Sequence, residues 1–454
     1  MATGIVIGAG DRGYDAYATY FLDEPGAGRI VAVAEPDEVR RARFADRYGL
    51  DPAGCFETWQ DLFAGPKLAD FAIVATGDAH HVEPTLAALA AGYHVLLEKP
   101  IALDEAGCRQ LLEASERAGR VLAICHVYRY SHLFSKLHAT IAAGELGEVV
   151  SIQQSENVSY WHYAHSYARG LTRRSEVPWL LQKACHDLDL IAWMAGAPAA
   201  RVSSFIRPTE LTDANAPSGA PAFCIEGCPH AETCPYDAVA LYRDLRPMLQ
   251  ELAMAPAPIG LAGQVARRGR PIARRIPVEA VQRRTDWWRW PVAAVTDDHT
   301  AAGLDHALRT TRWGRCAYKV GDNDQPSSQS VAIQFTNGVN ATFMLQSTSY
   351  RSMRSVRVDG TRGSAVGTLT ALGGSLLVAD HVSGRRRTVR IPNSFDGHGG
   401  GERPLFVDFL DAVRTGGEPR SSIRHSIESH RIAFAAMRSA REGVVVELAP
   451  DAPG

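Results

Sequence analysis

Two side chains stand out as able to do acid–base chemistry. Lys99 comes two residues after the apolar run at residues 94–97, and His186 lies within the half-apolar stretch at residues 180–193. Imidazole titrates near neutral pH without special tuning, so His186 is the candidate general base. A lysine cation can stabilise negative charge that develops on a reacting oxygen, and Lys99 is the candidate for that role.

The stretch at residues 180–193 has the apolar spacing of a helix. Residues three or four apart share a helix face, so Gln182 and Lys183 should lie beside His186, with Asp189 on the same side. Asp189 is expected either to orient the imidazole or to bind a substrate hydroxyl. The alternatives are that His186 is an ordinary core histidine and that Lys99 merely forms a surface ion pair with the preceding glutamate.

A glycine-rich turn lies close to the start of the chain. Residues 8–13 complete G-x-G-x-x-G between an apolar run at residues 4–7 and a helix-compatible stretch at residues 14–22. The first glycine would make a tight turn, the second would let the backbone approach a pyrophosphate, and the third would let helix and strand pack closely. The helix start would offer free N–H groups to that pyrophosphate. The predicted dinucleotide turn consists of Gly8, Ala9, Gly10, Asp11, Arg12 and Gly13.

Glu35 ends a second apolar run at residues 29–34. An acidic side chain at this position can accept hydrogen bonds from ribose hydroxyls and repels a 2′-phosphate, so NAD is favoured over NADP. Arg40 and Arg41 follow closely and could instead receive a 2′-phosphate.

Further apolar runs alternate with helical stretches up to about residue 126, which predicts a parallel, doubly wound Rossmann sheet. Ligands bind beyond the carboxyl ends of such strands, so the turns that follow each strand should converge. The turns after the runs at residues 71–76 and 94–97 therefore join the predicted cofactor site. Their residues are Thr76, Gly77, His81, Glu98 and Lys99.

The pattern changes near residue 127. Alternating strands of a half-exposed sheet are predicted at residues 148–157, 329–335, 340–347, 355–359, 364–369 and 387–391. We therefore expect an NAD-binding domain at residues 1–126 and, at residues 127–454, an α+β domain with a mostly antiparallel open sheet. An irregular insertion at about residues 207–317 interrupts the second domain.

The insertion holds the other chemical cluster, Cys224, Cys228 and Cys234. Three cysteines among glycine and prolines could wrap a structural Zn²⁺, with His230 or Cys316 as the fourth ligand. The alternative is a set of buried or redox-active thiols. Arginines and tryptophans between residues 267 and 290 could suggest a nucleic-acid patch, but packing at an oligomer interface explains them equally.

Overall composition excludes several classes of protein. The 454 residues are 46% hydrophobic, and 48 Lys and Arg nearly balance 50 Asp and Glu, so we expect no nucleic-acid partner. We expect no membrane partner, because no apolar run approaches the roughly 20 residues of a membrane span. The absence of a basic, apolar leader and the scattered cysteines favour a cytoplasmic location.

With these motifs in hand, the chain resembles the glucose-fructose oxidoreductase / inositol dehydrogenase / rhizopine catabolism (Gfo/Idh/MocA) family. The resemblance rests on five motifs: the glycine turn, the Thr76-to-His81 turn, Glu98-Lys99-Pro100, His186-Asp187-Leu188-Asp189 and His398-Gly399-Gly400-Gly401-Glu402. It implies an NAD(P)-dependent oxidoreductase that acts on sugars or cyclitols, and a homodimer or homotetramer built through the open sheet. It also implies a cis Pro100, and catalysis by Lys99 and His186.

Two features depart from the family pattern. Gln182 stands four residues before His186, where many members carry Asp, and Lys183 is expected to take over that contact with substrate. The cysteine-bearing insertion is absent from the simplest members. The expected reaction is hydride transfer between nicotinamide and a secondary alcohol of a sugar, glycoside or cyclitol. The alternative is a glycosidase that retains its NAD and acts by transient oxidation and elimination.

Overall fold

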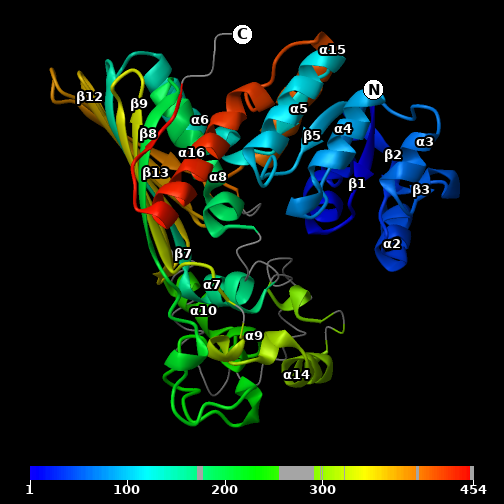
Figure 1. Cartoon of the computed structure of the whole chain (residues 1–454), viewed down its shortest axis with the longest axis vertical. Helices are drawn as coiled ribbons and strands as arrows, with labels where there is room; N and C mark the ends of the chain where they lie inside the picture. Colours follow the sequence, from blue (N-terminus) through cyan, green and yellow to red (C-terminus); the bar gives the residue numbers. More distant parts are fainter. Residues whose placement is uncertain are drawn as a thin grey trace.

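The computed structural model describes residues 1–170, 177–254, 291–296, 298, 300–321, 323–394 and 398–449. It contains two sheets, one near each end of the upper half of the molecule in Figure 1, and a lobe of short helices below them. No helix in these ranges is both long enough and apolar enough to span a membrane.

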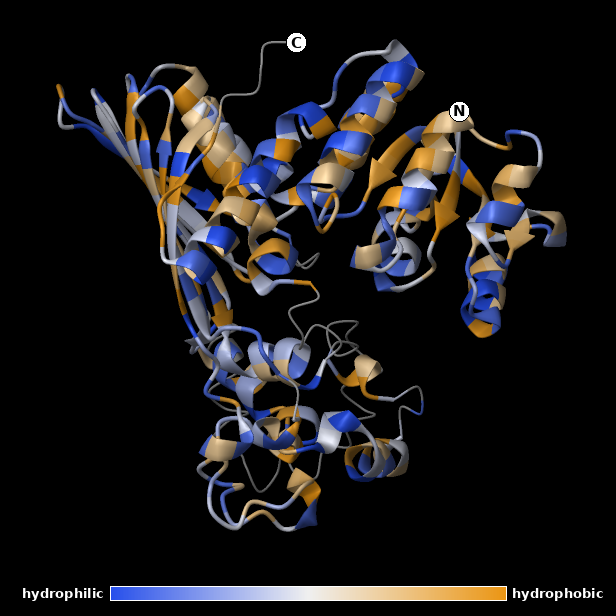
Figure 2. Cartoon of the chain, in the orientation of Figure 1, coloured by the Kyte–Doolittle hydropathy of each residue, from blue (hydrophilic) through white to orange (hydrophobic). Residues whose placement is uncertain are grey.

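The first sheet is parallel and has six strands in the order β3-β2-β1-β4-β5-β6. Its strands are β1 (Ala2–Ile7), β2 (Gly28–Ala34), β3 (Cys55–Phe56), β4 (Phe71–Val74), β5 (His94–Leu97) and β6 (Leu122–Ile124). Its helices are α1 (Tyr20–Asp23), α2 (Glu38–Tyr48), α3 (Trp59–Ala64), α4 (Val82–Ala90) and α5 (Glu105–Ala118). Strand order reverses between β1 and β4, where ligands bind in folds of this kind. The strands are apolar along their length in Figure 2, as expected for a sheet covered on both faces.

Local signals define the helices of this domain. The side chain of Asp37 accepts a hydrogen bond from the backbone N–H of Arg40 at the start of α2, and Gly49 ends the helix in the left-handed conformation. Asp104 and Gly119 do the same for α5. The predicted Rossmann sheet is confirmed, although the short β3 and α3 were not foreseen.

The second sheet is mixed and mostly antiparallel, with the order β14-β13-β12-β11-β7-β10-β9-β8-β15. Among the described strands of this sheet, only β7 and β10 pair in parallel. Its strands are β7 (Val149–Ser159), β8 (Ala199–Arg207), β9 (Ser328–Phe335), β10 (Asn340–Ser349), β11 (Met353–Gly360), β12 (Gly363–Thr370), β13 (Gly373–Asp380), β14 (Arg386–Ile391) and β15 (Val446–Glu447). Buried and exposed residues alternate along most of them, which confirms the predicted one-sided sheet.

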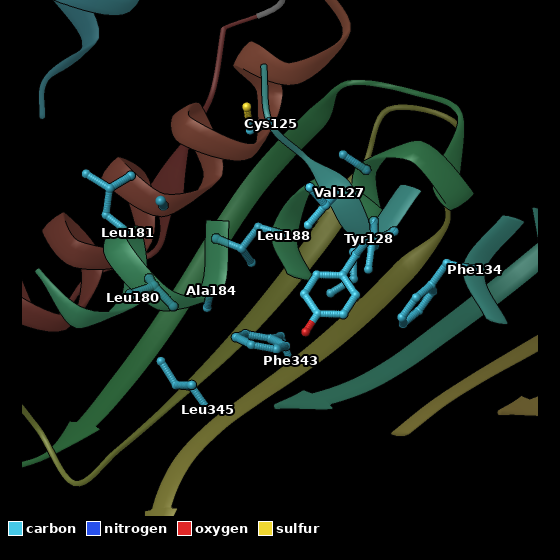
Figure 3. Close-up of a cluster of buried hydrophobic side chains, with 14 of the residues drawn as sticks. Cys125, Val127, Tyr128, Phe134, Leu180, Leu181, Ala184, Leu188, Phe343 and Leu345 are labelled. Atoms are coloured by element: carbon cyan, nitrogen blue, oxygen red, sulfur yellow. The ribbon is translucent and has the colours of Figure 1, made fainter. Parts of the chain in front are cut away.

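Helices cover one face of this sheet (Figure 1). They are α6 (His132–Ala142), α8 (Trp179–Ala195) and α16 (Ile423–Glu442), while α15 (Glu402–Thr415) packs nearer the first domain. Figure 3 shows the core between α8 and the sheet, where the ring of Tyr128 lies among Ala184, Leu188 and Phe343. This core fixes the position of α8, the helix that carries His186.

The C-terminal part of the chain also joins the first domain. The backbone N–H of Ile124 in β6 donates to the carbonyl of Ser421 at 2.8 Å, and α16 packs against α5. Burial lowers the pKa of His430 to about 3, and its neutral Nε2 accepts the backbone N–H of Ile101 at 2.8 Å. The two domains are therefore held together by continuous packing beside β6.

The insertion forms the lobe of short helices. Its described helices are α9 (Ala238–Tyr242), α10 (Arg246–Ala253) and α14 (Ala301–Thr310). They share a small core with Trp161 of α7 (Tyr160–Tyr163). The arginine- and tryptophan-rich stretch at residues 267–290 lies outside the described residues.

Candidate active site

The glycine turn joins β1 to a π-helical turn at Arg12–Tyr17. Gly8 has φ +92°, and a Cβ there would lie 2.6 Å from the carbonyl oxygen of Ala75. A Cβ on Gly13 would lie 2.0 Å from the carbonyl oxygen of Gly8, whereas one on Gly10 would meet nothing within 4 Å. The turn therefore requires Gly8 and Gly13 for its own packing and leaves space at Gly10 and the exposed Asp11 for a ligand.

Glu35 lies at the edge of this turn, at the end of β2. Its buried carboxylate accepts the backbone N–H of Ala9 at 2.7 Å and that of Asp37 at 3.0 Å. The guanidinium of Arg41 donates to the carbonyl oxygens of Glu35 and Pro36. An anion and a cation therefore both border the place where the fold would put a ribose.

Arg12 forms hydrogen bonds with three other side chains. It donates to Glu98 at 2.8 Å, to Glu402 at 3.1 Å and to the hydroxyl of Tyr17 at 2.7 Å. The arginine of the glycine motif thus connects the turn to the end of β5 and to α15, and its guanidinium is engaged by protein groups.

The turn after β4 is fixed by hydrogen bonds to the backbone. His81 is fully buried, with Nδ1 2.6 Å from the carbonyl oxygen of Pro100 and Nε2 3.2 Å from that of Thr76. The hydroxyl of Thr76 donates to the carbonyl of His80, and Gly77 is exposed. His81 therefore connects the turns after β4 and β5, the two predicted to meet at the cofactor.

Glu98 and Lys99 follow β5, and the Lys99–Pro100 peptide bond is cis, as the resemblance implies. Glu98 is buried and accepts the backbone N–H of Lys99 at 2.6 Å. Burial alone would raise the pKa of Glu98, but Arg12 and Lys99 outweigh it and hold the pKa below its ordinary value. The side chain of Lys99 does not form an ion pair with Glu98 at the surface, which was the alternative to a catalytic role. It reaches α8, where Nζ donates to the carbonyl oxygen of Gln182 at 2.8 Å.

His186 lies one helical turn after Gln182 and is 5% exposed. Its Nδ1 is 3.4 Å from Nδ1 of His126, and its ring packs edge-on against Tyr128. Burial, together with the nearby charge of Lys99, lowers the pKa of His186 well below 6.5. A neutral imidazole able to accept a proton thus lies close to the lysine cation, and no described residue bonds its Nε2.

Asp189 does not contact His186 directly in the part of the chain that the structure describes. It is 1% exposed and accepts two hydrogen bonds from Arg129, at 2.6 and 2.7 Å. Arg129 also donates to the carbonyl oxygens of Arg420 and His425. The nearest imidazole to Asp189 is that of His126, at 3.7 Å. That distance is too long for a hydrogen bond, so Asp189 acts on His126 through its charge.

Lys183 belongs to a group of four charged side chains behind His186. Its Nζ lies 3.5 Å from Glu156, while Arg354 binds Glu156 at 2.8 Å and Asp187 at 3.0 Å. Burial lowers the pKa of Lys183 and raises that of Glu156. Lys183 keeps 22% of its side-chain surface exposed and is the most exposed of the four, so it is the one best placed to reach a ligand.

The C-terminal segment also reaches the site. Nδ1 of His398 lies 3.0 Å from Glu402, and its ring packs edge-on against Tyr128 and lies 6.3 Å from that of His186. Because Glu402 also binds Arg12, this segment connects the candidate base to the glycine turn.

Sequence reasoning missed His126, Tyr128, Arg129 and Arg354 as parts of the site. The first three directly follow β6, at the carboxyl end of the parallel sheet, and that position was the available signal. Arg354 occupies an inward position in an alternating strand, where an arginine is unusual unless it is paired.

The predicted zinc site is not assembled in the described part of the insertion. No group of three or more His, Cys, Asp or Glu side chains there is arranged to hold a metal ion. Cys224 is buried against Arg169, and Nε2 of His230 lies 2.8 Å from the carbonyl oxygen of Ser218. Cys224, Cys228, Cys234 and Cys316 are all free thiols. Cys224 and Cys316 are buried in the small apolar core of the insertion, as the alternative interpretation expects, whereas Cys228 and Cys234 are half-buried.

A parallel dinucleotide-type sheet followed by a mixed sheet, with a lysine and a histidine where they meet, defines a two-domain oxidoreductase fold. Residues 3–126 match the profile described as "Oxidoreductase family, NAD-binding Rossmann fold", and residues 316–448 match "Oxidoreductase family, C-terminal alpha/beta domain". The chain belongs to the Gfo/Idh/MocA family.

Relatives with assigned activities match part of the chain. The inositol 2-dehydrogenase of Pseudomonas fluorescens is 30% identical over 191 residues, which cover 42% of this chain and 53% of that protein. The NADP-dependent D-xylose 1-dehydrogenase of Hypocrea jecorina is 37% identical over 122 residues, 26% of this chain and 31% of that protein. The chain thus spans about half the length of the inositol dehydrogenases that it matches.

Solved structures match over almost the full length. An oxidoreductase from Agrobacterium radiobacter, solved with NAD⁺, L-tartaric acid and magnesium, has a TM-score of 0.64 at 14% identity over 98% of both chains. A putative myo-inositol dehydrogenase from Sinorhizobium meliloti has a TM-score of 0.60 at 15% identity, covering 99% of this chain and all of that one. At sequence identities of 14% and 15%, this similarity shows that the fold is shared and nothing more.

Proposed function

We propose that the chain is an NAD-dependent dehydrogenase that oxidises a secondary alcohol of a sugar, glycoside or cyclitol. The observation that carries the proposal is the contact between Lys99 and α8. The lysine donates to the carbonyl of Gln182, one helical turn before His186, so a cation and a neutral imidazole from different domains meet at one place. Oxidation of an alcohol needs both groups.

The residues present fit a dinucleotide. The space at Gly10, within a turn that hydrogen bonds hold in place, supports binding of the pyrophosphate. The carboxylate of Glu35 supports binding of the ribose. When bound, the nicotinamide would supply the hydride acceptor. Glu35 supports NAD as the preferred form, because the negative charge of its buried carboxylate would repel a 2′-phosphate.

In the proposed reaction, His186 accepts the proton of the substrate hydroxyl at Nε2, and Lys99 donates a hydrogen bond to the oxygen as it becomes negative. Lys99 would exchange its bond to the Gln182 carbonyl for this one. Lys183 would contact another substrate hydroxyl. The names of the relatives, inositol and xylose dehydrogenases, support a polyhydroxylated substrate.

A substrate screen tests the proposal. The purified chain would be incubated with NAD⁺ and inositols, free aldoses or aryl glycosides, and NADH formation would be followed by absorbance. Net NADH with a free sugar or cyclitol is the expected result. Cleavage of a glycoside without net NADH would replace the proposal with the NAD-retaining glycosidase, and binding of NAD without either reaction would refute both.

We also propose that a second copy of the chain covers the open face of the second sheet. The face opposite the helices carries exposed apolar side chains on three strands, Phe205, Met344 and Val366. Light scattering should show a dimer or tetramer, and Phe205→Glu should shift it towards the monomer. A monomeric wild-type chain would refute this.

A further inference from the structure

His126 lies directly behind the candidate base. It follows β6 and is fully buried, and its Nδ1 is 3.4 Å from Nδ1 of His186. Its other ring nitrogen, Nε2, faces Oδ1 of Asp189 at 3.7 Å. The three side chains form a line from a carboxylate to the candidate base, and the two hydrogen bonds from Arg129 fix the carboxylate end.

Hydrogen-bonding capacity decides where the protons lie in this line. A neutral imidazole has one N–H donor and one acceptor nitrogen, whereas a carboxylate only accepts. Nε2 of His126 is too far from Asp189 for a hydrogen bond, but the negative charge 3.7 Å away favours the proton of His126 on Nε2. Its Nδ1 is then an acceptor, so the contact between the rings requires the proton of His186 to be on Nδ1. The lone pair of His186 is left on Nε2.

The surroundings keep both rings neutral. Burial and the nearby charges of Arg129 and Lys99 lower the pKa of His126 well below 6.5, and burial and Lys99 do the same for His186. The charged or titratable groups around the two rings include Lys99, Glu98, Tyr128, Arg129, Asp189, Arg354, His398 and His430.

We propose that His126 is a positioning residue that holds His186 in the tautomer with its lone pair on Nε2. This inference rests on the proposed function, in which that nitrogen receives the substrate proton. The proton moves from the hydroxyl oxygen to Nε2, the proton on Nδ1 stays in place, and Asp189 stabilises the resulting cation through His126. In this arrangement Asp189 helps to orient the imidazole of His186, as expected from the sequence, although the two side chains are not in direct contact.

The first test needs no substrate, so its outcome is separate from that of the proposed reaction. Isotope-labelled histidine and long-range proton–nitrogen NMR at neutral pH report which ring nitrogen carries hydrogen. His126→Gln and His186→Gln assign the two signals. We expect hydrogen on Nδ1 of His186 and on Nε2 of His126. Hydrogen on Nε2 of His186 would overturn the proposal.

The second test uses His126→Phe and His126→Asn. Phenylalanine fills the space but accepts no hydrogen bond, so we expect loss of the tautomer preference and a fall in kcat of about 10–100-fold, with NADH affinity unchanged. Asparagine places an amide oxygen near the position of Nδ1 and should retain the tautomer and most of kcat. The matched control is His138→Phe, because His138 stacks on Trp193 of α8 and lies outside the site.

Two outcomes of the second test would contradict the proposal. The first is a His126→Phe variant with wild-type tautomer and kcat. The second is a fall in kcat with the tautomer intact, which would mark His126 as a packing residue. If His126→Phe does not fold, the tautomer of His186 in the wild-type spectrum and in His126→Asn still tests the proposal.

Discussion

Replacing Arg354 with methionine should destabilise the second domain, because Arg354 pairs with two buried carboxylates. Lys183, 3.5 Å from Glu156, would remain as the other cation near one of them. Arg354 lies 2.8 Å from Glu156, 3.0 Å from Asp187 and 3.8 Å above the ring of Tyr128. Removing one partner of a buried pair typically costs about 3–5 kcal/mol, since the other charge is left uncompensated. Methionine keeps most of the apolar volume, so the loss should mainly report the charge.

The effect should depend on pH. Burial already raises the pKa of Glu156 in the folded chain, and Arg354 opposes that rise. Without Arg354 the pKa should rise further. A carboxylate with a higher pKa when folded binds its proton more tightly in the folded state, so stability falls as pH rises towards that pKa. The variant should therefore lose more stability relative to wild type at about pH 8 than at about pH 5.

Urea denaturation followed by tryptophan fluorescence measures both effects. The matched control is Arg357→Met on the same strand, where the guanidinium is exposed and pairs with Asp359 at 2.6 Å. The urea midpoint of this control should fall far less than that of Arg354→Met, because an exposed ion pair contributes little to stability. If Arg354→Met unfolds at the same urea concentration as the control at both pH values, the reasoning from buried charge is wrong.

Three other predictions concern the site and the insertion. Lys99→Ala and His186→Ala should each lower kcat by about 10² or more with little change in NAD affinity, and wild-type turnover in either variant would remove that residue from the proposed reaction. Fluorescence titration should give tighter binding of NADH than NADPH, and Glu35→Ala should reduce the difference; tighter binding of NADPH by the wild type would contradict the role of Glu35. Elemental analysis of protein purified without a polyhistidine tag should find no stoichiometric zinc and freely titratable thiols in the insertion, whereas one zinc per chain would restore the metal site.

Most of the fold was predictable because its signals are local. The glycine turn, the cap at Asp104 and the stop at Gly119 each depend on a few neighbouring residues. β13 was missed because it begins with Gly373 and Gly374, which have low strand propensity and no alternating pattern.

The site was predictable only where a residue belonged to a local motif. Lys99 and His186 could be chosen from their motifs and from strand or helix position. The pairing of Arg129 with Asp189 could not, because it joins residues 60 apart in the sequence and arises from the packing of α8 against the segment that follows β6. The same holds for Arg354, whose partners lie on β7 and α8. These contacts depend on how α8 packs against β7, β11 and the segment after β6 within the second domain, and no short segment encodes that packing.

The backbone bond between Ile124 and Ser421 limits how this protein can be divided or recombined. A fragment that ended at His126 would leave the outer edge of β6 uncovered and the N–H of Ile124 unpaired, which invites aggregation. A chimaera that exchanged only the first 126 residues for those of a relative would also place new residues against His430 and Glu402. Coenzyme-binding units transplanted between such proteins should therefore include the segment at residues 398–442, so the transferable unit is discontinuous in the gene.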